Sequence, residues 1–189
     1  MNALTRAILA IAIGSVAAPG WSQGGAYDGE QLVSAIRKGD GGAALALLKE
    51  KPSLVDARDL NGKTALIMAI ETRNDDWTGY LLQQGASPNL AMRDGETPLM
   101  VASRLGSQNA VDWLIASGAR VDDSNRKGET ALIVAVQRRQ LPVVRALLKA
   151  GADPDKTDSA AGYSAREYAK RDNRTPELLR AIEANKPKP

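Results

Sequence analysis

Two residue types with distinctive chemistry are missing, because the 189 residues include no cysteine and no histidine. Without cysteine there is neither a disulfide nor a thiolate nucleophile, and without histidine there is no imidazole base. The usual protein ligands of zinc and copper are missing as well. These absences exclude most familiar catalytic sites. They say nothing about location, since a cysteine-free chain is compatible with any redox compartment.

A strong imbalance of charge is also absent. Lys and Arg number 25 against 22 Asp and Glu, a formal net charge of +3. This is far from the dense positive field of a dedicated nucleic-acid-binding protein, so no nucleic-acid partner is expected. The length and the 43% hydrophobic content suit one well-buried domain better than two.

The apolar run near the N-terminus is too short to cross a membrane. Residues 1–6 include one positive charge, Arg6, and an uncharged run rich in Ala and Ile follows over 7–18. As a helix, twelve residues would reach about 18 Å, against a hydrocarbon core of about 30 Å. A charged start before a short apolar stretch is typical of a secretory signal peptide, which we expect over 1–22. The alternative, a buried N-terminal helix, lacks the polar face that such a helix would show.

Small residues place the expected cleavage site. Gly20 and Ser22 favour cleavage before Gln23, whereas Val16 and Ala18 would leave an unfavourable Pro19 next to the bond. No cysteine follows that could carry a lipid. We therefore expect a soluble product exported to the periplasm, without stable membrane insertion.

The rest of the chain repeats itself. Gly62, Gly95 and Gly128 lie 33 residues apart, and Gly162 follows one residue late. The same spacing relates Thr64, Thr97, Thr130 and, with the same delay, Ser164; Leu66, Leu99 and Leu132; Ala69, Ala102, Ala135 and, delayed, Ala169; and the pairs Gly85-Ala86, Gly118-Ala119 and Gly151-Ala152. Units begin as GKTALIMAI, GETPLMVAS and GETALIVAV, and end as LLQQGASPN, LIASGARVD and LLKAGADPD.

These blocks resemble the ankyrin repeat, and together with the N-terminal segment they resemble exported bacterial members of that family. The resemblance implies an all-α solenoid of helix-turn-helix units joined by β-hairpin-like loops. Its units are 59–91, 92–124 and 125–157, between divergent capping repeats at 28–58 and 158–185. Residues 23–27 are expected to be a short linker and 186–189 a disordered tail.

Local signals agree with these units. The hydroxyls of Thr64, Thr97, Thr130 and Ser164 can each cap a first helix, and Pro98 suits the first helical position. Pro142 and Thr175-Pro176 supply start signals for second helices. Gly85, Gly118 and Gly151 suit the position just after a second helix, where φ is positive.

Two departures from the family pattern stand out. Ile67, Met100 and Ile133 replace the family's histidine after the Thr-Pro-Leu triplet, so apolar packing must substitute for its hydrogen bonds. The family's glycine between the two helices is present as Gly106, but Arg73 and Arg139 take that place in neighbouring units. We expect Asn74 and the flanking backbone to relieve the resulting strain.

Other candidate features have plain structural interpretations. The acidic pairs Asp75-Asp76 and Asp122-Asp123 suit loops and helix caps better than a metal site, which would need further converging ligands. The run Gly39-Asp-Gly-Gly lacks the preceding strand and the following Lys-Ser/Thr of a phosphate loop, so a turn between helices is expected. Trp77, Tyr80 and Trp113 suit packing on second helices, with a binding role as the alternative.

The resemblance also implies a binding face, because ankyrin repeats bind partners through hairpin tips and the exposed side of first helices. On this chain those positions are Leu60, Asn61, Lys63, Glu71 and Thr72; Arg93, Asp94, Glu96, Arg104 and Leu105; Arg126, Lys127, Glu129, Gln137 and Arg138; and Tyr163, Arg171 and Asp172. The third set holds three bases and one acid, which gives the face a basic end.

The function implied is a non-catalytic adaptor, stabiliser or inhibitor that binds another protein, acting as a monomer without cofactor or metal. An alternative is binding of an anionic polymer or lipid headgroup by the basic third unit, which steep salt dependence would reveal. An enzyme is disfavoured, because it would have to rely on carboxylates that the sequence does not bring into one cleft.

Overall fold

The computed structural model describes residues 24–185, so the expected signal peptide at 1–22 and the tail at 186–189 lie outside it. Within that range the chain is helical, with no regular strand. The first elements are α1 (Gly24–Lys38), α2 (Gly41–Glu50) and the 3₁₀ turn η1 (Pro52–Asp56). Four helix pairs follow: α3 (Ala65–Glu71) and α4 (Asp75–Gln83), α5 (Pro98–Leu105) and α6 (Gln108–Ala116), α7 (Ala131–Gln137) and α8 (Leu141–Lys149), and α9 (Ala165–Arg171) and α10 (Pro176–Ala184).

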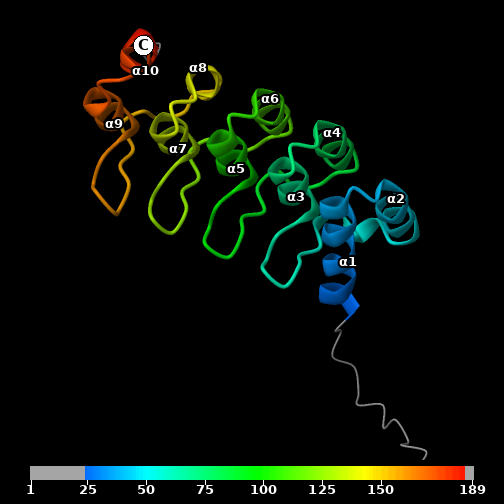
Figure 1. Ribbon diagram of the computed structural model, residues 1–189. Coiled ribbons are helices and arrows are strands. Elements are labelled where there is room, and N and C mark those ends of the chain that lie inside the picture. The colour runs from blue at the N-terminus through cyan, green and yellow to red at the C-terminus, as the bar shows by residue number, and fades with distance from the viewer. Residues whose placement is uncertain (1–23, 186–189) are drawn as a thin grey trace, which may run out of the picture.

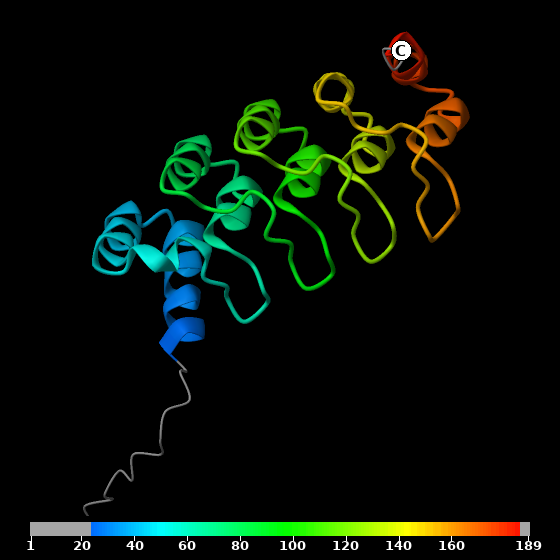
Figure 2. The same ribbon diagram turned by 180° about the vertical axis from the view of Figure 1, so that it is seen from behind.

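The helices stack in two rows. An inner row of α1, α3, α5, α7 and α9 lies against an outer row of α2, α4, α6, α8 and α10 (Figure 1). Long loops leave the inner row on one side, all in the same direction, as the view from behind also shows (Figure 2). Single bridges such as Arg58 with Thr64 close the bases of three loops. The predicted all-α solenoid with hairpin-like loops is confirmed.

The predicted helix caps form as expected. The hydroxyls of Thr64, Thr97 and Thr130 each accept a hydrogen bond from the backbone N–H three residues on, at 3.3 Å. Ser164 does the same and is joined by the carboxylate of Glu167, which accepts from the Ser164 N–H at 2.8 Å. In α3, α5, α7 and α9 a capping residue next to the helix therefore sets where the helix begins.

The expectation for Arg73 and Arg139 was wrong. Both adopt the left-handed conformation themselves, with φ of 54° and 56°, just as Gly106 does with φ 68°. In each unit this residue donates its N–H to the carbonyl three residues back, and the next residue donates to the carbonyl five residues back. These two hydrogen bonds require a left-handed backbone at this position, whichever residue occupies it. Asn74 instead caps α4, accepting from the Trp77 N–H at 3.0 Å.

The start of the first helix also differs from the prediction. Helix α1 begins at Gly24, so residues 24–27 are helical and do not form the linker expected over 23–27. The long helix extends beside the first hairpin loop (Figure 1). There the Glu30 carboxylate accepts from the Leu60 N–H at 3.3 Å, and Gly29 lies against the backbone of Arg58. These contacts place α1 against the exposed side of the hairpin that follows the first unit.

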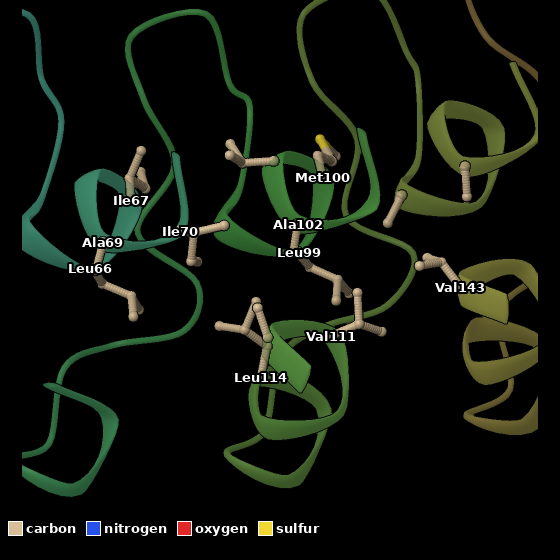
Figure 3. Close-up of a cluster of buried hydrophobic side chains, with 14 of the residues drawn as sticks. Leu66, Ile67, Ala69, Ile70, Leu99, Met100, Ala102, Val111, Leu114 and Val143 are labelled. Carbon is tan, nitrogen blue, oxygen red and sulfur yellow. The ribbon is translucent and has the colours of Figure 1, made fainter. Parts of the chain in front are cut away.

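The core runs continuously along the stack. The central inner helices α3, α5 and α7 are buried over six consecutive residues each, at 65–70, 98–103 and 131–136, because each is packed between its two neighbours and the outer row. Leu66, Leu99, Val111 and Leu114 point toward one another between the rows (Figure 3). Ile67, Met100 and Ile133, at the family's histidine position, are 0% exposed, so apolar packing occupies that position throughout.

Candidate binding face

The predicted binding residues begin where the buried part of each inner helix ends. Glu71 and Thr72 follow the buried run of α3, and Gln137 and Arg138 follow that of α7. The hairpin tips contribute the other residues and project from the same side in every unit (Figure 1). The tips are well exposed, and Leu60 has 66% of its surface accessible. The predicted residues thus share one side of the solenoid.

The hairpin tips are held by side-chain to backbone hydrogen bonds. Asp59 Oδ1 accepts from the N–H groups of Asn61 and Lys63, both at 2.8 Å. Asn125 Oδ1 accepts from those of Lys127 and Glu129 at 2.9 and 3.0 Å. A polar residue at this position therefore fixes the turn locally.

Neighbouring tips are also tied to one another. The Arg126 N–H donates to the Asp94 carbonyl at 3.0 Å, and the Ser159 N–H donates to the Lys127 carbonyl at 2.8 Å. Arg58 Nη1 donates to the carbonyls of Gly62 and Ala91, at 2.7 and 2.6 Å. A surface fixed in this way loses little conformational freedom on binding. The sequence does not single out Arg58, because a charged residue in a polar loop gives no sign that it makes these two hydrogen bonds.

A pair of positions eight residues apart is matched in three units. In the unit of α3, Lys63 Nζ contacts Glu71 Oε2 at 2.6 Å. In the unit of α5 the charges are reversed, and Arg104 Nε donates to Glu96 Oε1 at 3.0 Å. In the unit of α9, the guanidinium of Arg171 lies over the Tyr163 ring, 3.9 Å from its centroid.

The third unit breaks this pattern. The same positions hold Glu129 and Gln137, which cannot form an ion pair, and Glu129 accepts instead from Asn125 Nδ2 at 2.8 Å. Three cations on the binding face of this unit, Arg126, Lys127 and Arg138, are exposed. Among residues 24–185 no carboxylate lies within 4 Å of their charged groups, whereas ion pairs form on the same face in the units of α3 and α5.

A cavity of about 260 Å³ separates the second and third hairpins. Its walls contain eight of the predicted binding residues together with Asn125 and Val134: Asp94, Glu96, Arg104, Arg126, Lys127, Glu129, Gln137 and Arg138. The structure therefore brings together side chains that lie up to 44 positions apart in sequence, from Asp94 to Arg138. It leaves the predicted residues of the first and fourth units outside this cavity.

Asp172, another predicted binding residue, pairs with a residue outside the predicted set. Asp172 accepts two hydrogen bonds from the Arg139 guanidinium, at 2.8 and 3.1 Å, and this partner holds the pKa of Asp172 below its ordinary value. Arg73 reaches the next unit in the same way and donates to the Leu105 carbonyl at 2.8 Å. The two left-handed arginines therefore join successive units, which reduces the availability of Asp172 to a partner.

The aromatic residues lie on the outer row. Trp77 and Tyr80 meet edge to face with ring centroids 5.4 Å apart, and both are partly buried against the core. Trp113 lies against Gly79 and is 38% exposed. Packing accounts for Trp77 and Tyr80, while Trp113 retains substantial exposed surface.

The remaining candidates have structural roles. Asp75 accepts from Asn109 Nδ2 at 2.7 Å, and Asp122 Oδ1 accepts from the Asp153 N–H at 2.9 Å. In the run of glycines, Gly39 ends α1 and Asp40 caps α2, accepting from the Ala43 N–H at 2.9 Å. These are the caps and the helix-helix turn that the sequence predicts.

No group of three or more acidic side chains suited to a metal ion occurs between residues 24 and 185. In that part of the chain no helix has both the length and the apolar character needed to cross a membrane.

Comparison with known families agrees with this architecture. The family model for three copies of the ankyrin repeat matches residues 80–158, and that for a single ankyrin repeat matches residues 61–93. Together they span 61–158, more than half of the chain, which therefore belongs to the ankyrin-repeat family. No curated protein is significantly similar to the chain. Ankyrin repeats are protein-protein interaction modules, and proteins built from them are generally non-enzymatic scaffolds.

Proposed function

We propose that this protein is a non-catalytic binding module, exported to the periplasm, that holds a partner protein against its hairpin tips and the exposed ends of α3, α5, α7 and α9. It acts there as an adaptor, stabiliser or inhibitor, and as a monomer. The absence of cysteine and histidine from the whole sequence supports a non-catalytic role.

One observation supports the binding face above all. In α3, α5 and α7 a run of six buried residues is followed by more exposed side chains, Glu71-Thr72, Arg104-Leu105 and Gln137-Arg138, and this change recurs at the same place in these three units. The exposed residues are not required for the core, while the backbone beneath them is fixed by hydrogen bonds between tips. A rigid surface with variable side chains suits recognition of a partner.

Affinity capture tests the binding face. The protein is immobilised and exposed to periplasmic extract, beside a variant with Leu60→Ala, Arg104→Ala and Arg138→Ala. We expect a partner to be retained by the wild type and lost from the variant, with unchanged helical content. Equal retention by both would move the binding site away from this face.

Export rests on the N-terminal sequence, which has the charged start and short apolar run of a signal peptide. We expect the purified protein to begin at Gln23 or within a few residues of it, as measured by N-terminal sequencing. A charge within the apolar run, Ile11→Lys, should leave the precursor uncleaved in the cytoplasm. Finding an intact Met1 on the wild-type protein would disprove export by cleavage.

Binding of an anionic polymer or lipid headgroup by the third unit is a second candidate, favoured by the exposed Arg126, Lys127 and Arg138. Such binding would weaken steeply with added salt. Titration with heparin and with anionic vesicles at two salt concentrations measures it.

A further inference from the structure

We propose that the cavity between the second and third hairpins receives acidic side chains, aspartate or glutamate, from a segment of the partner protein. This inference rests on the proposed function and specifies the chemistry of the partner. It starts from three exposed cations in the cavity walls, Arg126, Lys127 and Arg138, for which residues 24–185 supply no ion-pair partner.

The carboxylates in the cavity walls are already engaged. Glu96 accepts two hydrogen bonds from Arg104, at 3.0 and 3.4 Å. Asp94 Oδ1 accepts from the Glu96 N–H at 3.0 Å, and Glu129 accepts from Asn125 Nδ2 at 2.8 Å. Arg104 therefore neutralises Glu96, while neutral donors hold Asp94 and Glu129 in position.

Three of the cations in the same walls have no such partners. Arg126, Lys127 and Arg138 are exposed, and their side chains make no hydrogen bond or ion pair to any residue between 24 and 185. The backbone of Arg126 and Lys127 is nevertheless held in place through Asp94, Asn125 and Ser159. The cavity thus presents positive side chains with open donors on a backbone that is held in place, and a carboxylate on a partner is complementary to them.

The size and charge of the cavity favour a protein segment over a polyanion. At about 260 Å³ it is smaller than a pocket for a drug-sized ligand, so it suits one or two side chains. Asp94 and Glu129, which have no cationic partner among residues 24–185, lie in the same walls and would repel a polymer that carries negative charge at every repeat. Individual carboxylates can contact the cations without approaching those acids.

Peptide selection tests this inference. The protein, expressed from Met1 and purified in the form that the cell produces, is used to select from a random twelve-residue peptide library at low salt. We expect selected peptides to be enriched in Asp and Glu. Their affinity should fall about tenfold in the variant Arg126→Gln, Lys127→Gln, Arg138→Gln, as expected for the loss of three exposed charge pairs.

The matched control removes the same charge from the outer row. Lys49→Gln, Arg145→Gln and Lys149→Gln are all at exposed positions, and this variant should bind the selected peptides as the wild type does. Because none of the six side chains has a described ion-pair partner, both variants should keep the thermal midpoint of the wild type.

Several results would overturn the inference. If selected peptides lack acidic enrichment, or bind the Arg126, Lys127, Arg138 variant unchanged, the acidic-segment inference fails while the protein-binding function stands. If heparin competes for this site more strongly than the peptides, the site is one for polyanions. If the protein retains neither peptide nor periplasmic partner, the proposed function fails as well.

Discussion

Leu132 offers a direct test of the packing between units, through the substitution Leu132→Ala. The side chain is 0% exposed and belongs to α7, which packs against α5, α8 and α9. Truncation to alanine removes about three methylene equivalents from the core, at roughly 0.8 kcal/mol each, and the remaining cavity adds a further cost. We expect the free energy of unfolding to fall by about 3 kcal/mol.

The same chemical change at an exposed site is the control. Leu60 is 66% exposed at a hairpin tip, so Leu60→Ala should change the free energy of unfolding by less than about 0.5 kcal/mol. Urea unfolding followed by far-UV circular dichroism compares the two variants. Both the midpoint and the slope of the free energy of unfolding against urea concentration are measured. A changed slope would show that the repeat units unfold separately.

The result that would refute this reasoning is a Leu132→Ala midpoint equal to that of Leu60→Ala. Leu132 would then not be enclosed between units, and the register that aligns it with Leu66 and Leu99 would be wrong.

Two further predictions concern the third hairpin and the loss of stability at acid pH. At Gly128, with φ 74°, an added Cβ would lie 2.6 Å from Ser159 Oγ and 2.7 Å from its backbone nitrogen, whereas at Gly151, with φ 91°, it would meet nothing within 4 Å. Gly128→Ala should therefore lower the thermal midpoint more than Gly151→Ala, and equal effects would show that backbone conformation alone decides. Burial acts to raise the pKa of Asp158, but hydrogen bonds from the Tyr168 hydroxyl and from the N–H groups of residues 160–162 outweigh it and lower the pKa below the ordinary 3.8. Its contribution to stability is present above pH 3.8 and is lost as pH falls through the lower folded value. In the variant Asp158→Asn, the free energy of unfolding should fall less steeply as pH is lowered from pH 5. An unchanged pH dependence would contradict the role given to Asp158.

The sequence by itself determined the solenoid and its register. The Thr caps and the glycines after the second helices act over three or four residues. Because these local signals recur every 33 residues, the sequence alone shows where each helix pair begins and ends. The side of the molecule on which the predicted binding residues lie follows from the same register.

The tertiary structure decided which of those residues have partners. Contacts such as Arg139 with Asp172, 33 positions on, exist only because successive units stack. The left-handed conformation of Arg73 and Arg139 follows from the hydrogen bonds that close each inner helix, which residue preference alone predicts poorly. Whether Arg126, Lys127 and Arg138 are neutralised depends on where the nearby carboxylates lie, and those in the cavity come from two hairpins that the stacking brings together.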